Sequence, residues 1–129
     1  MILLDTHIWI WWVQDHAALT RRHRELLNQY QSDVGVSVFS CWEIAKLVER
    51  GRLELSCPLH DWLVQALNYP GVSLLELTPE IVIESTQLPR PFHRDPADQL
   101  LVASARIYQV PLVTSDVKIL NYPHVKTIG

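Results

Sequence analysis

The sequence has only two cysteines and four glycines in 129 residues, and it lacks long apolar runs. Cys41 and Cys57 cannot build a disulfide framework and are not spaced as CxxC, which favours a reduced chain. No apolar run approaches the roughly 18 residues that span a membrane. The first acid stands at position 5 with no basic segment before it, which predicts no secretory signal. We therefore expect a cytoplasmic protein that does not enter a membrane.

Several sequence motifs of catalysis are also missing. Neither a GxxxxGK[ST] loop nor a GxGxxG fingerprint occurs, so the usual phosphate loops of nucleotide-cofactor sites are absent. The six histidines and two cysteines show no zinc-ligand spacing such as HExxH, and there is no GxSxG element for a serine nucleophile. The chemistry must then be carried by other residue types.

Charge is modest, with 11 basic and 14 acidic residues and a net charge of −3. This balance does not indicate a general nucleic-acid binder, for which a strongly basic chain is expected. Apolar residues make up 48%, which excludes disorder as the main state. With no linker or repeat, we expect one domain over residues 1–129.

Short apolar runs alternate with segments of helical period. The expected strands are 2–4, 34–38, 72–77, 112–114 and 125–128. The expected helices are 8–13, 17 or 20 to 30, 41–50, 58–68, 79–88, 95–109 and 116–120. Thr6 and Ser40 are expected helix caps, and Gly51 an expected helix end. This alternation predicts an α/β/α sandwich around a mostly parallel sheet of about four to five strands.

Two acids follow expected strands. Asp5 comes directly after residues 2–4, and Asp116 comes two residues after the strand at 112–114. In open α/β sheets, ligands bind beyond the carboxyl ends of the strands. Each acid could instead cap the helix that follows it, and taken singly that role is the more frequent one.

Two further acids lie on expected helices. Asp98 shares a helical row with Leu101, Val102 and Ala105, where a buried carboxylate needs a partner such as a metal ion. The alternative is a capping box with Asp95. Glu43 has apolar neighbours, and its alternative is a surface pair with Lys46.

Four carboxylates at strand ends and helix starts would provide hard oxygen ligands. Such ligands suit Mg²⁺ or Mn²⁺ better than zinc. His7 and His93 each stand near an acid, but a lone histidine is more often structural than catalytic.

Four segments resemble the acidic motifs of PIN-domain proteins, and most closely the toxin ribonucleases of the VapC type. They are LLDTHIWIWW at 3–12, SVFSCWEIAKL at 37–47, HRDPADQLLVASA at 93–105 and LVTSD at 112–116. The segments occur in the order typical of the family and extend over most of the chain. Each motif alone is weak, whereas the ordered set is specific.

The resemblance implies a dimeric, Mg²⁺- or Mn²⁺-dependent endoribonuclease, the toxin of a toxin–antitoxin module, which is neutralised by a cognate antitoxin protein. It matches the four family acids, in order, to Asp5, Glu43, Asp98 and Asp116. Thr114 matches the small hydroxyl residue that precedes the last acid. Metal-activated water would then hydrolyse RNA phosphodiester bonds and leave a 5′-phosphate and a 3′-hydroxyl.

Two alternatives remain open at this point. One is a PIN-like module that binds RNA or a protein without cleaving. The other is a metal-dependent phosphatase, although that class would have DxD after the first strand, where this chain has Asp5-Thr6-His7. If RNA is the substrate, cations must offset the acids. Four basic residues near the acids in sequence are the candidates: Arg94, Arg90, Lys46 and Arg50.

Overall fold

Five parallel strands form the centre of the computed structural model, which describes all 129 residues. The strands are β1 (Ile2–Leu4), β2 (Val34–Ser37), β3 (Val72–Leu75), β4 (Leu112–Val113) and β5 (Thr127–Ile128). Their order across the sheet is β3-β2-β1-β4-β5, and every neighbouring pair is parallel. The predicted fold class is therefore confirmed, at the upper end of the expected strand number.

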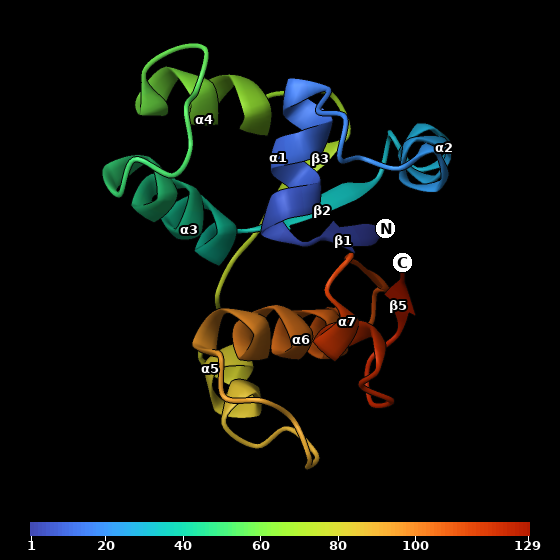
Figure 1. The fold of residues 1–129 in the computed structure, drawn as a ribbon. Helices are drawn as coiled ribbons and strands as arrows, with labels where there is room; N and C mark the ends of the chain where they lie inside the picture. Colours follow the sequence, from blue (N-terminus) through green and yellow to red (C-terminus); the bar gives the residue numbers. More distant parts are fainter.

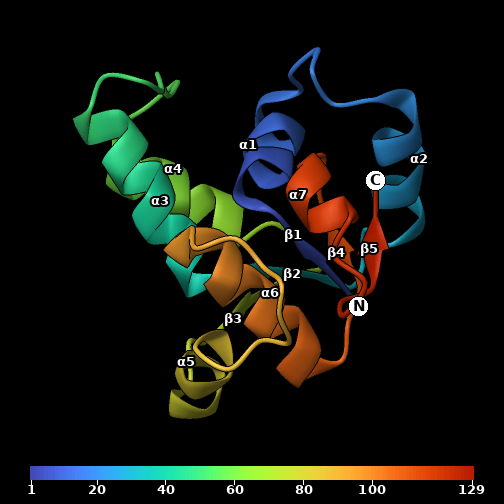
Figure 2. The ribbon, with the colours of Figure 1, turned by 60° about the horizontal axis from the view of Figure 1, so that its bottom comes forward.

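Seven helices cover the two faces of this sheet. They are α1 (Thr6–Gln14), α2 (Arg21–Gln29), α3 (Val38–Glu49), α4 (Leu59–Leu67), α5 (Pro79–Ser85), α6 (Pro96–Tyr108) and α7 (Val117–Leu120). Figure 1 shows α1 to α4 on one side of the strands and α5 to α7 on the other, and Figure 2 shows α5 next to α6. None of the helices combines the length and apolarity needed to cross a membrane.

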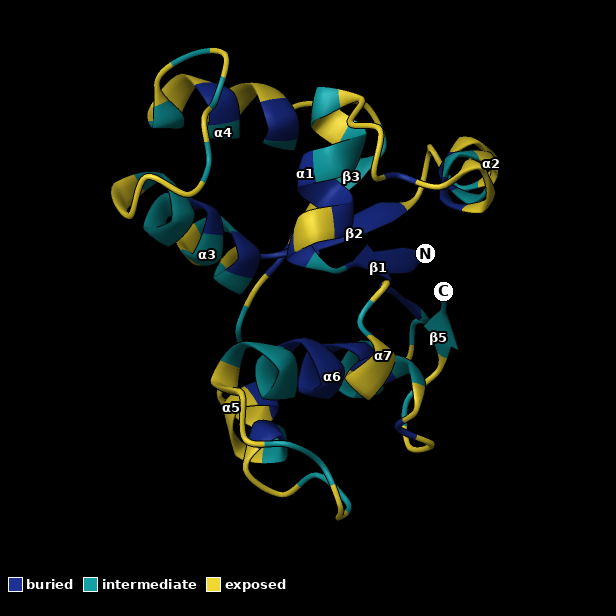
Figure 3. Ribbon diagram, viewed as in Figure 1, coloured by how far each residue is buried: buried dark blue, intermediate teal, exposed yellow.

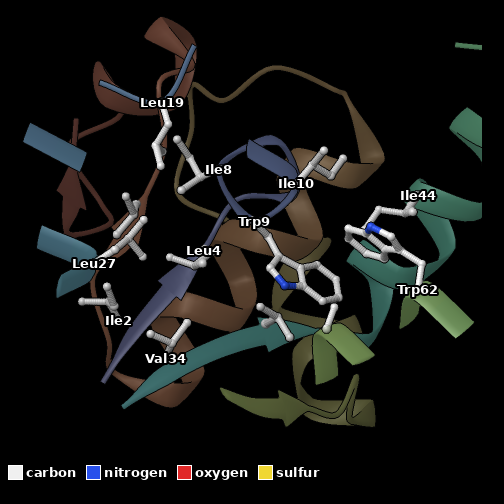
Figure 4. Packing of buried hydrophobic residues seen from close by; sticks show 13 residues of the cluster. Ile2, Leu4, Ile8, Trp9, Ile10, Leu19, Leu27, Val34, Ile44 and Trp62 are labelled. Atoms are coloured by element: carbon white, nitrogen blue, oxygen red, sulfur yellow. The ribbon is translucent and has the colours of Figure 1, made fainter. Parts of the chain in front are cut away.

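Each face of the sheet has its own apolar core, because successive strand residues point to opposite faces. Ile2 and Leu4 face the larger core with residues of α1 to α4, whereas Leu3 faces the smaller core with residues of α6 and α7. In the larger core, the ring of Trp9 lies 5.7 Å from that of Trp62 on α4 (Figure 4). The three inner strands β1, β2 and β4 are buried throughout, whereas the edge strands β3 and β5 are mostly half-buried or exposed. Figure 3 shows this difference between β1 or β2 and β5.

Helix α3 starts three residues earlier than expected. Its N-cap is Ser37, whose hydroxyl accepts a hydrogen bond from the Phe39 amide at 3.1 Å. The predicted cap, Ser40, is instead fully buried inside the helix. Thr6 is likewise the first residue of α1 and not its cap. Both corrections have one physical cause: their hydroxyls bond each other, 2.8 Å apart, and so are not available to cap.

Other predicted helix ends are confirmed. The Thr78 hydroxyl caps α5 by accepting from the Ile81 amide at 3.2 Å, and the Asp95 carboxylate caps α6. Gly51 follows α3 with φ of +69°, a left-handed conformation that glycine adopts without strain. The strand β1 has the expected bounds, whereas β2, β3 and β4 end one or two residues earlier than expected and β5 starts two residues later.

The strand order creates a switch point between β1 and β4. The chain leaves β1 into α1 on one face and leaves β4 into α7 on the other (Figure 1). Such a divergence opens a crevice at the carboxyl ends of the two strands, where α/β proteins bind ligands. Asp5 and Asp116 follow these two strands.

Candidate active site

Asp5 lies at the switch point and is held by the neighbouring strand segment. Its Oδ2 accepts a hydrogen bond from the Thr114 hydroxyl at 2.6 Å, and Thr114 is fully buried directly after β4. Thr114 Oγ1 in turn accepts from the Asp116 amide at 3.0 Å. Asp5 occupies the N-cap position of α1 but makes no side-chain capping bond. The strongest interaction of the Asp5 carboxylate is therefore with Thr114 across the sheet and not with the first turn of α1.

Glu43 faces α1 from the second turn of α3. Its Oε1 accepts a hydrogen bond from the Thr6 hydroxyl at 2.6 Å, and Thr6 also bonds the Ser40 hydroxyl. Ser40 and Glu43 are three residues apart, so they share the face that meets α1. Lys46 pairs with Glu49 at 3.0 Å and makes no ion pair with Glu43. The surface-pair alternative for Glu43 is therefore wrong.

Asp98 projects from the first turn of α6 towards the preceding loop. Its Oδ2 lies 2.5 Å from Nε2 of His93, and the two side chains are 18% and 22% exposed. The Asp98 amide donates to the Asp95 carboxylate at 3.1 Å, so Asp95 is the cap, as expected. The Asp98 carboxylate itself does not return to the cap.

His93, which the sequence analysis noted near an acid but regarded as more often structural than catalytic, is the partner of Asp98. The two residues stand five positions apart in HRDPAD. The loop is held in place because the Gln99 side chain donates to the His93 carbonyl at 3.1 Å and the Phe92 and His93 ring centroids are 4.3 Å apart. His7, the other histidine near an acid, is exposed and contacts Trp11.

Asp116 does cap a helix. Its Oδ1 accepts from the Lys118 amide at 2.8 Å at the start of α7. This confirms the structural alternative for Asp116 without removing the residue from the acidic crevice, because its charge raises the pKa of both Asp5 and Asp98.

Burial and mutual repulsion raise the pKa values of three of the acids. Burial is the main cause for each, and it raises the pKa of Glu43 from 4.5 to about 6. The neighbouring charges of Asp5 and Asp98 raise it further, whereas the Thr6 hydrogen bond lowers it. The pKa of Asp5 is raised by burial and lowered by the Thr114 bond, and that of Asp98 is raised by burial and lowered by the His93 bond.

These interactions place each of the four predicted acids within electrostatic reach of two of the others. No three Asp, Glu, His or Cys side chains converge closely enough to form a ready-made ion-binding cluster. The donor chemistry nevertheless fits a hard divalent cation, since the set offers only carboxylate oxygens, and the pKa values of Asp5, Glu43 and Asp98 are raised. A bound cation would relieve the repulsion that the acids exert on each other.

The predicted basic residues have different surroundings. Arg90 and Arg94 are exposed, make no ion pair, and line a cavity of about 450 Å³ together with Thr86 and Gln99. Lys46 is engaged with Glu49, and Arg50 is exposed at the end of α3.

A cavity of about 890 Å³ lies elsewhere, where Trp12, Trp62 and Tyr69 contribute to its walls. None of the four acids lines it. The acids and the cavity are therefore separate features of the surface.

Comparison with known proteins agrees with the fold. The family described as PIN domain matches residues 2–125. Ribonuclease VapC22 of Mycobacterium tuberculosis is 29% identical over 127 residues, which cover 98% of this chain and 95% of that protein. Two solved structures share the fold: a toxin–antitoxin complex from Klebsiella pneumoniae (TM-score 0.70, 16% identity, 100% of this chain and 97% of that chain) and FitAcB from Neisseria gonorrhoeae (TM-score 0.71, 19% identity, 100% and 97%).

Proposed function

The chain belongs to the PIN domain family, and from this premise we propose that it is a metal-dependent endoribonuclease that acts as the toxin of a toxin–antitoxin module. Support for the ribonuclease activity comes from the similarity to Ribonuclease VapC22, which extends over nearly the full length of both chains. We further propose that residues 1–129 form one domain that carries the whole active site.

One observation of the structure carries the proposal. Asp5, Glu43 and Asp98 come from three different segments, and each carboxylate accepts one hydrogen bond at the edge of the same crevice. Burial and like charge raise all three pKa values. Such arrangements are common at functional sites and are costly elsewhere. A purely structural set of helix caps would not bury these charges together.

We assign Asp5, Glu43 and Asp98 to the binding of Mg²⁺ or Mn²⁺, with Asp116 as the fourth acid. A divalent ion would lower the pKa of a water molecule and stabilise the charge that develops on the phosphate oxygens. The chain itself holds the acids for this task. Thr114 orients Asp5, Thr6 orients Glu43, and His93 contacts Asp98.

The basic residues of the 89–95 loop supply the contacts to the RNA backbone in this proposal. Arg90 and Arg94 lie in the segment that leads into Asp98, and neither has an acidic partner within the chain. They can therefore contact phosphate without first breaking an ion pair. Lys46 and Arg50 form a second group, on the helix that carries Glu43.

The structural neighbours suggest a protein partner. One is described as a toxin–antitoxin complex and another as VapBC2 of Rickettsia felis bound to a DNA fragment from their promoter. We propose that this chain is cytoplasmic, forms a homodimer and is neutralised by a cognate antitoxin.

Cleavage of RNA tests the proposal directly. The purified chain should cleave RNA in the presence of Mn²⁺ or Mg²⁺ and lose this activity when the ion is chelated. Asp98→Asn should abolish cleavage, because it removes a charge from the acidic crevice. Asp95→Asn is the matched control: it lies three residues away on the same turn, and asparagine caps a helix as well as aspartate. It should retain most of the activity.

Circular dichroism must show both variants folded. Cleavage by wild type that persists after chelation would contradict metal dependence. Full activity of Asp98→Asn would remove Asp98 from the site. A folded wild type that binds RNA but never cleaves it would identify a binding module instead.

A further inference from the structure

One tryptophan of this chain has no place in either core. Trp9 and Trp62 are buried, and Trp11 and Trp12 are partly buried against the larger core. Trp42 on α3 is 53% exposed. An indole that is left in water without a packing role is costly, and large exposed aromatic surface usually marks a contact with another molecule.

The surroundings of Trp42 are aromatic on one side and basic on the other. The ring of Phe39 stacks on it with a centroid distance of 5.3 Å and an interplanar angle of 30°. Lys46 Nζ lies 5.7 Å from the centroid of the Trp42 ring. The three residues are three and four positions apart, so they form one row along α3. We call this row, Phe39, Trp42 and Lys46, the aromatic ridge.

The aromatic ridge is adjacent to the acidic crevice. Trp42 directly precedes Glu43, whose carboxylate bonds Thr6 next to Asp5. Consecutive helical residues point about 100° apart, so the ridge and the Glu43 side chain occupy neighbouring faces of α3. A polymer with one phosphate at the acids would have its neighbouring nucleotides within reach of the ridge.

We propose that the aromatic ridge is a stacking site for a nucleobase of single-stranded RNA held at the acidic crevice, an inference that rests on the proposed ribonuclease function. Unpaired bases stack on aromatic side chains, and every base has a face that can do so. Trp42 supplies the exposed ring, and Phe39 supports it from the side. Lys46 lies beside the Trp42 ring and pairs with Glu49 in the free chain, and it can exchange this exposed ion pair for the phosphate of the stacked nucleotide.

The charges on α3 favour RNA over a protein partner. Continuing the row by one turn from Lys46 leads to Arg50, which is exposed and makes no ion pair. A row of aromatic and then basic residues complements a chain of bases and phosphates. A stable protein contact would need about 800 Å² on each partner with an apolar centre. On α3 only Trp42 and Val38 are large apolar residues exposed to solvent.

Binding measurements with and without bases test this assignment. The probe is a fluorescein-labelled single-stranded RNA of random sequence, compared with an abasic ribose–phosphate chain of the same length. Both are titrated onto the full chain carrying Asp98→Asn, so that no cleavage occurs. Trp42→Ala is compared with Trp42→Phe and with Tyr69→Ala, an equally exposed aromatic that lines the separate cavity of α1 and α4.

Trp42→Ala should weaken binding of the intact RNA by about 5- to 100-fold, the range that stacking of one base contributes. It should leave binding of the abasic chain unchanged. Trp42→Phe should recover most of the loss, and Tyr69→Ala should have no effect. In the Asp98-containing protein, Trp42→Ala should raise KM for RNA more than it lowers kcat.

Other results would overturn the assignment. If Trp42→Ala binds the intact RNA as tightly as the protein with Trp42, the stacking site is refuted. If the wild type still cleaves RNA with Mn²⁺, the ribonuclease function is not affected by that result. An equal loss for intact and abasic chains means that the contact is with the backbone. A changed sedimentation coefficient with unchanged RNA affinity identifies the ridge as a protein interface. Failure of the wild type to bind or cleave any RNA removes the ribonuclease function and the stacking site together.

Discussion

Replacing Glu43 with glutamine should stabilise the metal-free protein at neutral pH. Burial and the charges of Asp5 and Asp98 raise the pKa of Glu43 from 4.5 to about 6. The ionised form is therefore less favourable in the folded chain than in the unfolded chain. Glutamine has the same shape, and its carbonyl can still accept the hydrogen bond from Thr6.

The expected magnitude follows from the pKa difference. Each pKa unit corresponds to about 1.4 kcal/mol, so the full shift would be equivalent to about 2 kcal/mol. Glu43 is only partly buried, and solvent screening reduces the amount by which its ionised form lowers the free energy of unfolding to about 1 kcal/mol. Between about pH 4.5 and about pH 6 the folded chain binds more protons than the unfolded chain, and its stability falls as pH rises. Glu43→Gln removes this contribution. For a chain of this size the gain corresponds to a rise in Tm of roughly 4 °C above about pH 7.

Thermal melts in EDTA at a series of pH values measure this effect. The difference in Tm between Glu43→Gln and wild type should be near zero below about pH 4.5 and reach its full size above about pH 7. Adding millimolar Mn²⁺ should raise the Tm of wild type more than that of the variant, because an ion that binds only the folded state stabilises it. If Glu43→Gln melts at or below wild type at neutral pH without metal, Glu43 is not held as a destabilising buried carboxylate and its assignment to the crevice is wrong.

Two further predictions concern RNA contacts and the backbone. In the Asp98→Asn protein, which should not cleave, Arg94→Ala should weaken RNA binding and flatten the slope of log affinity against log salt by about 0.7. Arg22 is exposed and makes no ion pair, and Arg22→Ala should leave both the affinity and the slope nearly unchanged. Equal slopes with Arg94 and with Arg94→Ala would show that Arg94 does not contact phosphate. Gly71 has φ of +87°, and a Cβ there would lie 2.1 Å from a backbone carbonyl oxygen. At Gly51, which also has a positive φ, a Cβ would meet nothing within 4 Å, so Gly51→Ala should lower the free energy of unfolding by roughly 1–2 kcal/mol. Urea unfolding should show a larger loss of this free energy for Gly71→Ala. Equal losses would mean that the loop at Gly71 adjusts freely.

The sheet could be predicted because its strands are short apolar runs bounded by turn residues. Residues 2–4 and 112–113 stand out in this way, and their alternation with helical segments leaves a parallel arrangement as the main solution. The start of α3 could not be predicted in the same way. Ser37 and Ser40 are both good capping residues, and the choice depends on whether Ser40 finds another partner. That partner is Thr6, 34 positions away, which no local pattern reveals.

The candidate site could likewise be predicted only in part. The rule that parallel strands end at one edge was sufficient to bring Asp5 and Asp116 together. The apolar neighbours of Glu43 and Asp98 made these two acids candidates, and the family resemblance joined all four in one site. Side-chain orientation was outside the reach of both. The contact between His93 and Asp98 depends on how the loop before α6 folds back, which the spacing of the two residues does not determine. The exposure of Trp42 depends on which face of α3 meets the rest of the fold.

The site is arranged so that its acids are held in place but not fully compensated. Each of Asp5, Glu43 and Asp98 has a single protein partner, namely Thr114, Thr6 and His93. Those partners lower the pKa values, yet burial and like charge outweigh them in every case. A fully satisfied network would have lower pKa values and would gain little from a cation. The unfavourable electrostatics that remain are therefore the free energy that a divalent ion can recover on binding, which links the stability cost of the crevice to its proposed use.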